Sequence, residues 1–319
     1  MNLCISPSLA HYSPGARLFL GMAIGDAFGA RFENNTRDII SLIGEEETYR
    51  DANRYTDDTQ MAIGIADLLI SEDIFTAENL AQSLMAAYHR DPRCGYSHLT
   101  KTMLENSANA QEFLRTLSER ERTQRKSDGA AMRALPIGFL NKTNEVIRYA
   151  SQSANITHAH PDALAATVGI ALIAHDRYHH HKKFQEIIVT LPEKIPYLTT
   201  PARNYLDNII HNKWNPEIIL GKYLNYGVPY TESIILLGAV MALLTEFGEY
   251  PHQALLESVK LGGDTDTTAC IVLGASLLYP SNPLPDTLIL GLENGIFGIE
   301  YLIRLGNELG KKFPPANNN

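Results

Sequence analysis

The stretch Gly262-Gly263-Asp264-Thr265-Asp266-Thr267-Thr268 places two carboxylates and three hydroxyls between two apolar runs. Residues 231–245 before it have apolar side chains at helical spacing, and residues 269–278 after it are almost wholly apolar. The pattern predicts that the acids open a buried helix. No Lys or Arg lies between Gly262 and Pro280, so a hard metal cation could neutralise them. An N-terminal helix cap is the alternative, but it explains one acid and not two.

A second loop of the same kind lies far upstream, at Tyr55-Thr56-Asp57-Asp58-Thr59-Gln60. It precedes another helical stripe, and Asp57 and Gln60 have the spacing of a capping box. Capping again explains only one of the two acids. Two distant loops of this kind would together supply the oxygen ligands that Mg²⁺ prefers, and two metals could share them.

These two loops, TDDT at 56–59 and GGDTDT at 262–267, resemble the paired signatures of the ADP-ribosylglycohydrolases. That family includes dinitrogenase-reductase-activating glycohydrolase and hydrolases of ADP-ribosylarginine and ADP-ribosylserine, and the resemblance runs from about residue 16 to 309. It implies a compact orthogonal helical bundle with a cleft for two Mg²⁺ ions, which Mn²⁺ could replace. The implied metal ligands are Thr56, Asp57, Asp58, Asp264, Asp266 and Thr267.

The composition sets the fold class independently of this resemblance. The chain has 319 residues, 45% hydrophobic and 20% charged, enough to bury a large core. Helical stripes recur with Gly and Ala between them, and no stretch keeps the alternation of a strand, so we expect an all-α fold. Because the two acidic loops must meet, we expect one domain, residues 1–319, with 1–14 and 314–319 as loose ends.

Charge and cysteine content exclude several function classes. A net charge of −9 and a pI near 5.7 argue against a nucleic-acid partner. The one basic run, SERERTQRK at 118–126, is predicted to be a solvated loop, with a phosphate-facing surface as the alternative. Cys4, Cys94 and Cys270 lack metal-site spacing and are predicted to be free thiols in a reducing compartment. No apolar run approaches the ~20 residues of a membrane span, so we expect a cytoplasmic monomer without a membrane partner.

Asp26 and Glu33 place carboxylates in and after an apolar segment, residues 16–30. Their chemistry alone leaves two alternatives open: functional acids, or a capped core acid at Asp26 and a solvated turn at Glu33. The segment GDAFGARFE, 25–33, resembles the family's GDALGxxxE segment. That resemblance implies that Glu33 lies at the substrate and orients or deprotonates a water molecule.

Three further segments carry implied substrate contacts. SDGAAMR, 127–133, resembles the family's GNGAAMR, a Gly-rich turn that enters a helix and lines the ribose and phosphate pocket. Asp128 stands where Asn is usual and adds a negative charge. Cys94-Gly95-Tyr96 resembles the RGYG loop of serine-directed members, without the Asp of a DVG sequence, and we assign Asp91 no metal role. His158 lies in a THxxP-like motif, although a hydrogen-bonded structural histidine is the alternative. The substrate contacts expected from these segments are Gly95, Tyr96, Asp128, Gly129, Ala130, Met132 and His158.

Two other groups are less specific. The tract His179-His180-His181 lacks zinc-ligand spacing and is predicted to be a surface loop. One of the aromatic residues Trp214, Tyr223 and Tyr226 could stack on adenine.

The expected function is a Mg²⁺-dependent hydrolase that cleaves the bond at C1″ of the terminal ribose. Its partner would be an ADP-ribosylated protein or a small ADP-ribose conjugate, with arginine favoured over serine as the acceptor. Two alternatives remain open: a non-catalytic ADP-ribose-binding or structural member of the same fold, and a metal phosphohydrolase that attacks phosphorus.

Overall fold

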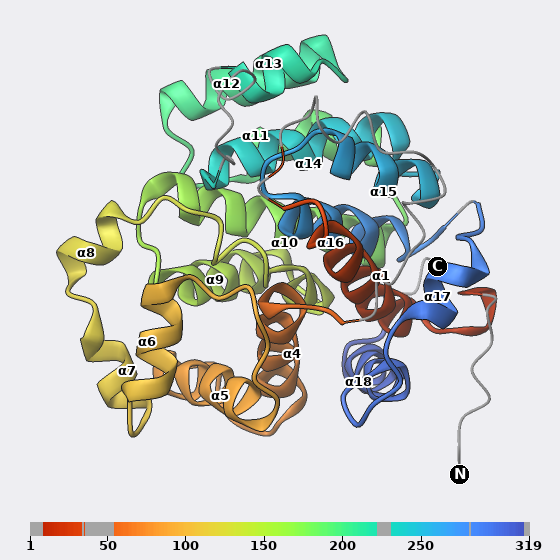
Figure 1. Cartoon of the computed structure of the whole chain (residues 1–319). Helices are drawn as coiled ribbons and strands as arrows, with labels where there is room; N and C mark the ends of the chain where they lie inside the picture. Colours follow the sequence, from red (N-terminus) through yellow and green to blue (C-terminus); the bar gives the residue numbers. More distant parts are fainter. Residues whose placement is uncertain (1–8, 34, 36–53, 222–230, 281, 316–319) are drawn as a thin grey trace.

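The computed structural model describes residues 9–33, 35, 54–221, 231–280 and 282–315 (Figure 1). Within these residues no β-strand occurs, and the one isolated bridge pairs Ser127 with Glu232. The predicted all-α class is therefore confirmed. None of the described helices is both long and apolar enough to span a membrane.

The described helices follow one another as short to medium segments, most of them antiparallel or crossing their neighbours (Figure 1). The first half contains η1 (Leu9–His11), α1 (Pro14–Gly29), α4 (Asp57–Ile70), α5 (Ala77–Arg90), α6 (His98–Asn106), α7 (Ala110–Thr116), α8 (Glu119–Gln124), η2 (Leu135–Phe139) and α9 (Thr143–Asn155). The second half contains α10 (Pro161–His180), α11 (Phe184–Lys194), α12 (Thr200–Asn212), α13 (Pro216–Leu220), α14 (Ser233–Phe247), α15 (Pro251–Lys260), α16 (Thr265–Ser276), α17 (Asp286–Gly291) and α18 (Ile299–Lys312).

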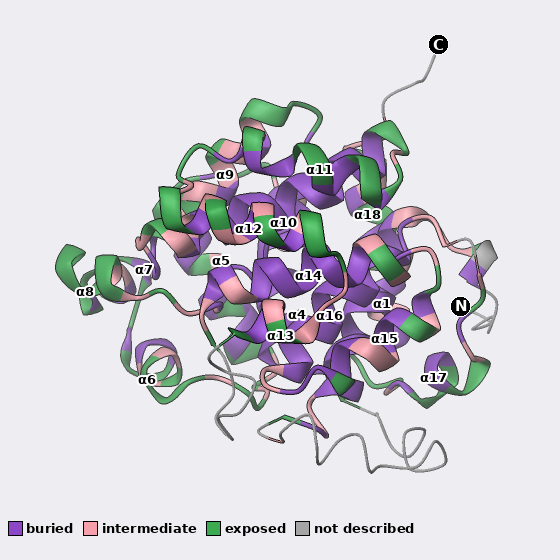
Figure 2. Ribbon diagram, turned by 90° about the horizontal axis from the view of Figure 1, so that it is seen from above, coloured by how far each residue is buried: buried purple, intermediate pink, exposed green. Residues whose placement is uncertain are grey.

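The centre of the molecule is the contact between α1 and α16, which are buried along almost their whole length (Figure 2). Glycines at every fourth position of α1 face the backbone of α16. A Cβ atom on Gly25 would lie 2.2 Å from the carbonyl oxygen of Ala269, and one on Gly29 would lie 2.3 Å from that of Thr265. Only glycine allows this approach. Because α16 starts at Thr265, the contact also fixes the position of the second acidic loop.

Other helices surround this centre, and some of them, such as α9 and α18, bury one apolar face and expose the other. α10 is buried on almost every side and packs against α9, α14 and η2. α6, α8 and α9 carry exposed surfaces in Figure 2. The free thiols expected at Cys94 and Cys270 are confirmed, exposed and buried respectively, and Cys4 lies outside the described residues.

Two local predictions are wrong. The basic run at 118–126 is not wholly a loop, because Ser118 and Glu121 form a reciprocal capping box that starts α8. The histidine tract is not a surface loop either. The Ala-rich helix α10 continues through His180, and His179 is buried with its Nε2 3.0 Å from the carbonyl oxygen of Phe139.

Candidate active site

Asp26 anchors the first acidic loop. Its carboxylate, fully buried in α1, accepts hydrogen bonds from the backbone amides of Thr56 and Thr59, the former at 2.9 Å. Both threonine hydroxyls also donate to it, each at 2.7 Å. Burial raises the pKa of Asp26 to about 6, while these hydrogen bonds act in the opposite direction. Asp26 is thus the capped core acid of the two alternatives, and it fixes the start of α4.

The first loop opens its helix without the capping box that its spacing suggested. Thr56 is the N-cap residue and makes no capping side-chain bond, because the Thr59 amide in the first turn donates to the Asp26 carboxylate instead. Asp57 and Asp58 occupy the first turn of α4, where the helix dipole favours negative charge. The Gln60 side chain instead donates to the carbonyl oxygens of Ala87 and Asp91. Asp57 and Gln60 are therefore not a capping pair, and that prediction is wrong.

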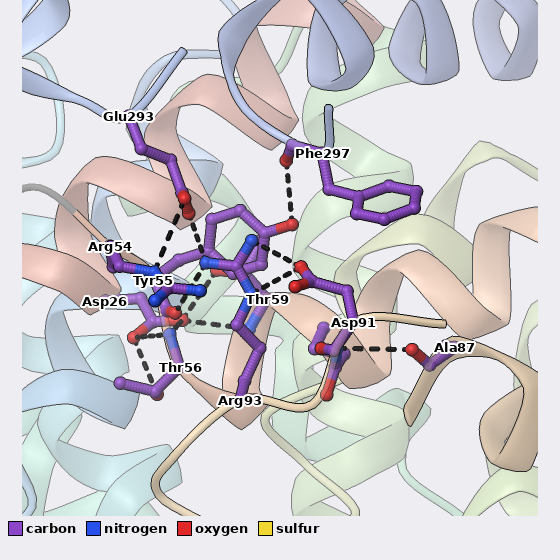
Figure 3. A network of polar contacts seen from close by, with 11 residues as sticks. Asp26, Arg54, Tyr55, Thr56, Thr59, Ala87, Asp91, Arg93, Glu293 and Phe297 are labelled. Atoms are coloured by element: carbon purple, nitrogen blue, oxygen red, sulfur yellow. Dashed lines mark hydrogen bonds and ion pairs between the residues drawn. The ribbon is translucent and has the colours of Figure 1, made fainter. Parts of the chain in front are cut away.

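A buried ion-pair network holds the other side of this loop (Figure 3). The Arg93 side chain, only 3% exposed, pairs with Asp91 and Glu293. Its guanidinium carbon lies 3.9 Å from the ring centre of Tyr55, and the Tyr55 hydroxyl donates to the Phe297 carbonyl oxygen at 2.8 Å. Because Asp91 is occupied by this pair, it is not free to bind a metal. Sequence reasoning missed the network, since its three segments lie far apart in the chain.

The second acidic loop has the helix start that its sequence predicts. Gly262 and Gly263 adopt φ angles of 79° and 82°, a region that favours glycine. Asp264 is the N-cap residue of α16, and its side chain accepts a hydrogen bond from the Thr267 amide at 3.3 Å. The Thr265 hydroxyl donates to the Gly29 carbonyl oxygen at 2.8 Å. This bond ties the loop to the C-terminal end of α1.

The two loops meet at a cavity of about 320 Å³. Glu33, an exposed residue after α1, also lines it. Gly95 lines the same cavity with a φ angle of 100°, and a Cβ atom there would lie 1.9 Å from Asp57 Oδ1. A side chain at this position would collide with the acid. The predicted site residues that line the cavity are Glu33, Asp57, Asp58, Gly95, Asp128, Gly129, Met132, His158, Asp264, Asp266 and Thr267.

Three predicted site residues are not among the residues that line this cavity. Thr56 is buried, and its hydroxyl donates to Asp26. The Tyr96 hydroxyl donates to Gln60 Oε1 at 2.6 Å, and Ala130 is fully buried. Of the aromatic residues considered for adenine, Trp214 packs edge-on against Phe247. Tyr223 and Tyr226 lie outside the described residues.

The acids of the cavity destabilise one another. Burial raises the pKa of Asp57, Asp58, Asp264 and Asp266 well above the ordinary value, and neighbouring carboxylates raise it further. Asp58 Oδ1 is buried without a hydrogen-bond partner, as is Asp128 Oδ2. Burial also raises the pKa of Asp128 to about 7. Such a set of oxygen atoms is costly to ionise without a counter-charge.

The donor set fits a hard divalent cation chemically. All of these groups are oxygen ligands, as Mg²⁺ prefers, and two of their oxygens are unpartnered. As they stand, however, no three His, Cys, Asp or Glu side chains in the described part of the chain form a group that could hold a metal ion. Binding a cation would therefore draw the acids of the two loops closer together.

The Gly-rich turn at 127–133 leads into the 3₁₀-helix η2 and not into an α-helix, which corrects that expectation. Pro136, in the first turn of η2, cannot donate a backbone hydrogen bond. The buried Arg133 stabilises the turn by donating to the Gly129 carbonyl oxygen at 2.9 Å and to the Thr157 hydroxyl at 3.0 Å. These hydrogen bonds join the turn to the segment at Thr157.

His158 lines the cavity together with this arginine. Its Nδ1 is 2.8 Å from the Thr157 hydroxyl, and its Nε2 is 2.9 Å from the Ser127 hydroxyl. Burial lowers the pKa of His158 well below the ordinary value, and the positive charges of Arg125 and Arg133 lower it further. His158 is hydrogen-bonded through both ring nitrogens, as the structural alternative predicts, and it lines the cavity. Its contact with substrate stays a prediction.

Arg125 is a cavity residue that sequence reasoning did not single out. Its Nη1 is buried without a hydrogen-bond partner, whereas the neighbouring Lys126 pairs with Glu232 at 2.7 Å. The signal was the basic run, for which a phosphate-facing surface was the alternative. The cavity thus has two groups of opposite charge: the acids of the two loops, and Arg125 with Arg133.

Comparison with known proteins decides the family. A family model described as ADP-ribosylglycohydrolase matches residues 15–317. The chain belongs to the ADP-ribosylglycohydrolase family. The family and enzyme class predicted from the sequence are confirmed.

Similar proteins agree with this membership. ADP-ribosylhydrolase ARH3 of Homo sapiens is 24% identical over 84% of this chain and 85% of its own length. ADP-ribosylhydrolase ARH3 of Xenopus tropicalis is 32% identical, but the match spans 44% of this chain and 43% of that relative. An uncharacterised protein of Archaeoglobus fulgidus is 28% identical over 90% of this chain and 93% of its own.

A solved structure has the same fold. It is described as an ADP-ribosylglycohydrolase-related protein complex, with a TM-score of 0.70 and 19% identity over 94% of this chain and 98% of that one. The likeness supports the fold alone.

The raised pKa of Asp58 predicts how the stability of this family member depends on pH without metal. In the folded chain Asp58 keeps its proton to a higher pH than in the unfolded chain, so its contribution is present below about pH 4 and is lost as pH rises. Asp58→Asn should therefore stabilise the metal-free protein increasingly from pH 4 to pH 8, by about 1.4 kcal/mol per pKa unit of the shift that it removes. Thermal unfolding in chelator measures the difference.

The quantity to compare is the difference in unfolding free energy between Asp58→Asn and wild type at each pH. The absolute stability of either protein is less informative, because the buried histidines His158 and His175 have lowered pKa values and change stability with pH in the opposite direction. Asp73→Asn, at an exposed position, is the control with the same change of net charge. A stabilisation by Asp58→Asn that is constant with pH, or equal to that of Asp73→Asn, would contradict the electrostatic account.

Proposed function

We propose that the protein hydrolyses the bond at C1″ of the terminal ribose of an ADP-ribose conjugate with the help of two bound Mg²⁺ ions. The observation that carries the proposal is the cavity where carboxylates of two loops far apart in the sequence meet Glu33. A purely structural role gives no reason to bury mutually repelling acids beside an open cavity.

In this proposal Thr56, Asp57, Asp58, Asp264, Asp266 and Thr267 hold the cations. When bound, these would supply a Lewis acid for the ribose oxygens and offset charge that develops at the reacting sugar. Glu33 orients a water molecule or takes its proton. Asp26 keeps Thr56 and Thr59 in place through its hydrogen bonds.

The opposite charges of the cavity support an ADP-ribose ligand. A diphosphate needs a cation or hydrogen-bond donors, and Arg125 has a buried Nη1 without a hydrogen-bond partner. Ser127 lines the same cavity, with its hydroxyl 2.9 Å from His158 Nε2. The sugar would then lie toward the acids and Glu33, where the reaction takes place.

Metal dependence and product identity test the proposal together. Chelation should abolish release of ADP-ribose from a conjugate, and Mg²⁺ or Mn²⁺ should restore it. Asp58→Asn and Asp264→Asn should each lower activity by orders of magnitude, while Asp73→Asn should not. Chromatography of the products separates the alternatives. Free ADP-ribose supports the proposal, AMP or phosphate indicates a phosphohydrolase, and binding without turnover indicates a non-catalytic member.

Glu33→Gln tests the acid/base role. The variant keeps shape and hydrogen bonding but loses basicity, so kcat should fall by roughly 10²–10⁴, the usual range for a lost general acid or base. The dissociation constant for ADP-ribose should change little. Glu72→Gln, at a fully exposed position, is the matched control. An unchanged kcat for Glu33→Gln would leave Glu33 without a catalytic role.

Arginine is the acceptor that we propose over serine. The GAAMR and THAHP segments resemble arginine-directed members, although the Gly95 loop resembles serine-directed ones. Asp128 is buried among the other acids at the cavity, and a nearby carboxylate favours a cationic guanidinium leaving group. An alkoxide from serine instead needs a proton donor or a metal.

Matched peptides with ADP-ribose on arginine or on serine test this choice at saturating Mg²⁺. Wild type should release ADP-ribose faster from arginine, and Asp128→Asn should reduce the ratio of the two rates. Faster release from serine by wild type would refute the preference. An unchanged ratio in Asp128→Asn would remove Asp128 from its explanation.

A further inference from the structure

We propose that Asp128 is itself a cation ligand and binds the same ion as Asp264. The inference rests on the cation site of the proposed function and adds a ligand to it. The site would then have five aspartates from three segments of the chain: Asp57, Asp58, Asp128, Asp264 and Asp266.

The backbone fixes Asp128 at the edge of the cavity. Its amide donates to the Thr231 carbonyl oxygen at 3.1 Å, and its own carbonyl oxygen accepts from the amides of Ala131 and Met132. The residue is 7% exposed and lines the cavity together with Asp264 and Asp266. Asp128 therefore has little freedom to turn its carboxylate into solvent.

The Asp128 side chain lacks a full set of hydrogen-bond partners for its carboxylate. One carboxylate oxygen of Asp128 has no hydrogen-bond partner, and the carboxyl group is in hydrogen-bonding contact with that of Asp264. Two carboxylates offer only acceptors to each other, so their contact requires a proton or a cation between them. The other charges that act most on Asp128 are those of Asp266 and Asp57, which are negative as well.

The positive groups of the cavity do not fill this role. Arg133 donates to the Gly129 carbonyl oxygen and to Ser153 and Thr157, and it forms no ion pair with Asp128. An Asn at 128, as in the family pattern, could donate its amide hydrogens to Asp264. Asp cannot do so when ionised, and it offers the oxygen atoms that a hard cation takes. The exchange of Asn for Asp thus replaces a donor with a metal ligand.

Calorimetric titration of Mg²⁺ and of Mn²⁺ into the metal-stripped full chain, without substrate, tests the inference. Asp128→Asn should weaken cation binding at least about tenfold, the lower end of the loss for groups that only support a metal ligand. Asp73→Asn changes net charge equally and should bind as wild type does. In the double variant Asp128→Asn/Asp264→Asn the loss should be smaller than the product of the two single losses, because both remove ligands of one ion.

The outcomes separate this inference from the proposed function. Binding by Asp128→Asn within twofold of wild type would overturn the inference while leaving the cation site, and a fully multiplicative double variant would overturn the shared ion. No binding by wild type would overturn both. Asp128→Ser is a second, smaller uncharged variant, and circular dichroism with an unfolding curve in chelator confirms that each variant is folded.

Discussion

Repulsion between buried carboxylates is the constraint on which the arrangement of the cavity depends. Asp57, Asp264 and Asp266 each raise the pKa of Asp58, and Asp266 also raises that of Asp57. Left to themselves, such groups would move apart or expose themselves to water. The surrounding structure prevents both, because each loop is bound to a rigid helix. The chain therefore stabilises an unfavourable charge distribution through contacts outside the cavity.

Two kinds of anchor achieve this. Asp26 uses its own negative charge to organise amides and hydroxyls of Thr56 and Thr59, so it holds the first loop without neutralising it. Arg93 acts from the other side and joins the loop to Glu293 near the C-terminal helix. A buried pair of this kind is sensitive to loss of one partner, which leaves an uncompensated charge. Both anchors leave the carboxylates of Asp57 and Asp58 directed to the cavity.

The sequence predicted most of the local structure of the site and little of what holds it together. The helix starts at Asp57 and Thr265, the all-α class and the family follow from short motifs and periodicity, because those signals lie within a few residues. The capping box at Asp57 is absent because α4 begins one residue earlier, with Thr56 as its N-cap, and because the Gln60 side chain donates to the distant carbonyl oxygens of Ala87 and Asp91.

Long-range contacts also explain two other features that the sequence did not predict correctly, the Arg93 network and the histidine tract. The Arg93 network joins residues about 200 positions apart, and nothing in the local sequence marks Glu293 as its partner. The surface loop predicted for the histidine tract at 179–181 is wrong because the Ala-rich helix α10 extends beyond the end that its polar residues suggest. In both cases tertiary packing decided what local composition could not.

The cavity arginines form no ion pairs with the cavity aspartates in the described part of the chain, and this affects which ligand the cavity can bind. Arg125 and Arg133 line the same cavity as five aspartates. Arg133 nevertheless donates its hydrogen bonds to backbone and hydroxyl oxygens, and Arg125 has one buried nitrogen without a hydrogen-bond partner. If these arginines formed salt bridges with the acids, the charges would neutralise each other and little charge would remain for a ligand. Because no ion pair joins the two groups in the described part of the chain, a ligand that is anionic at one end and bound through cations at the other would interact favourably with both.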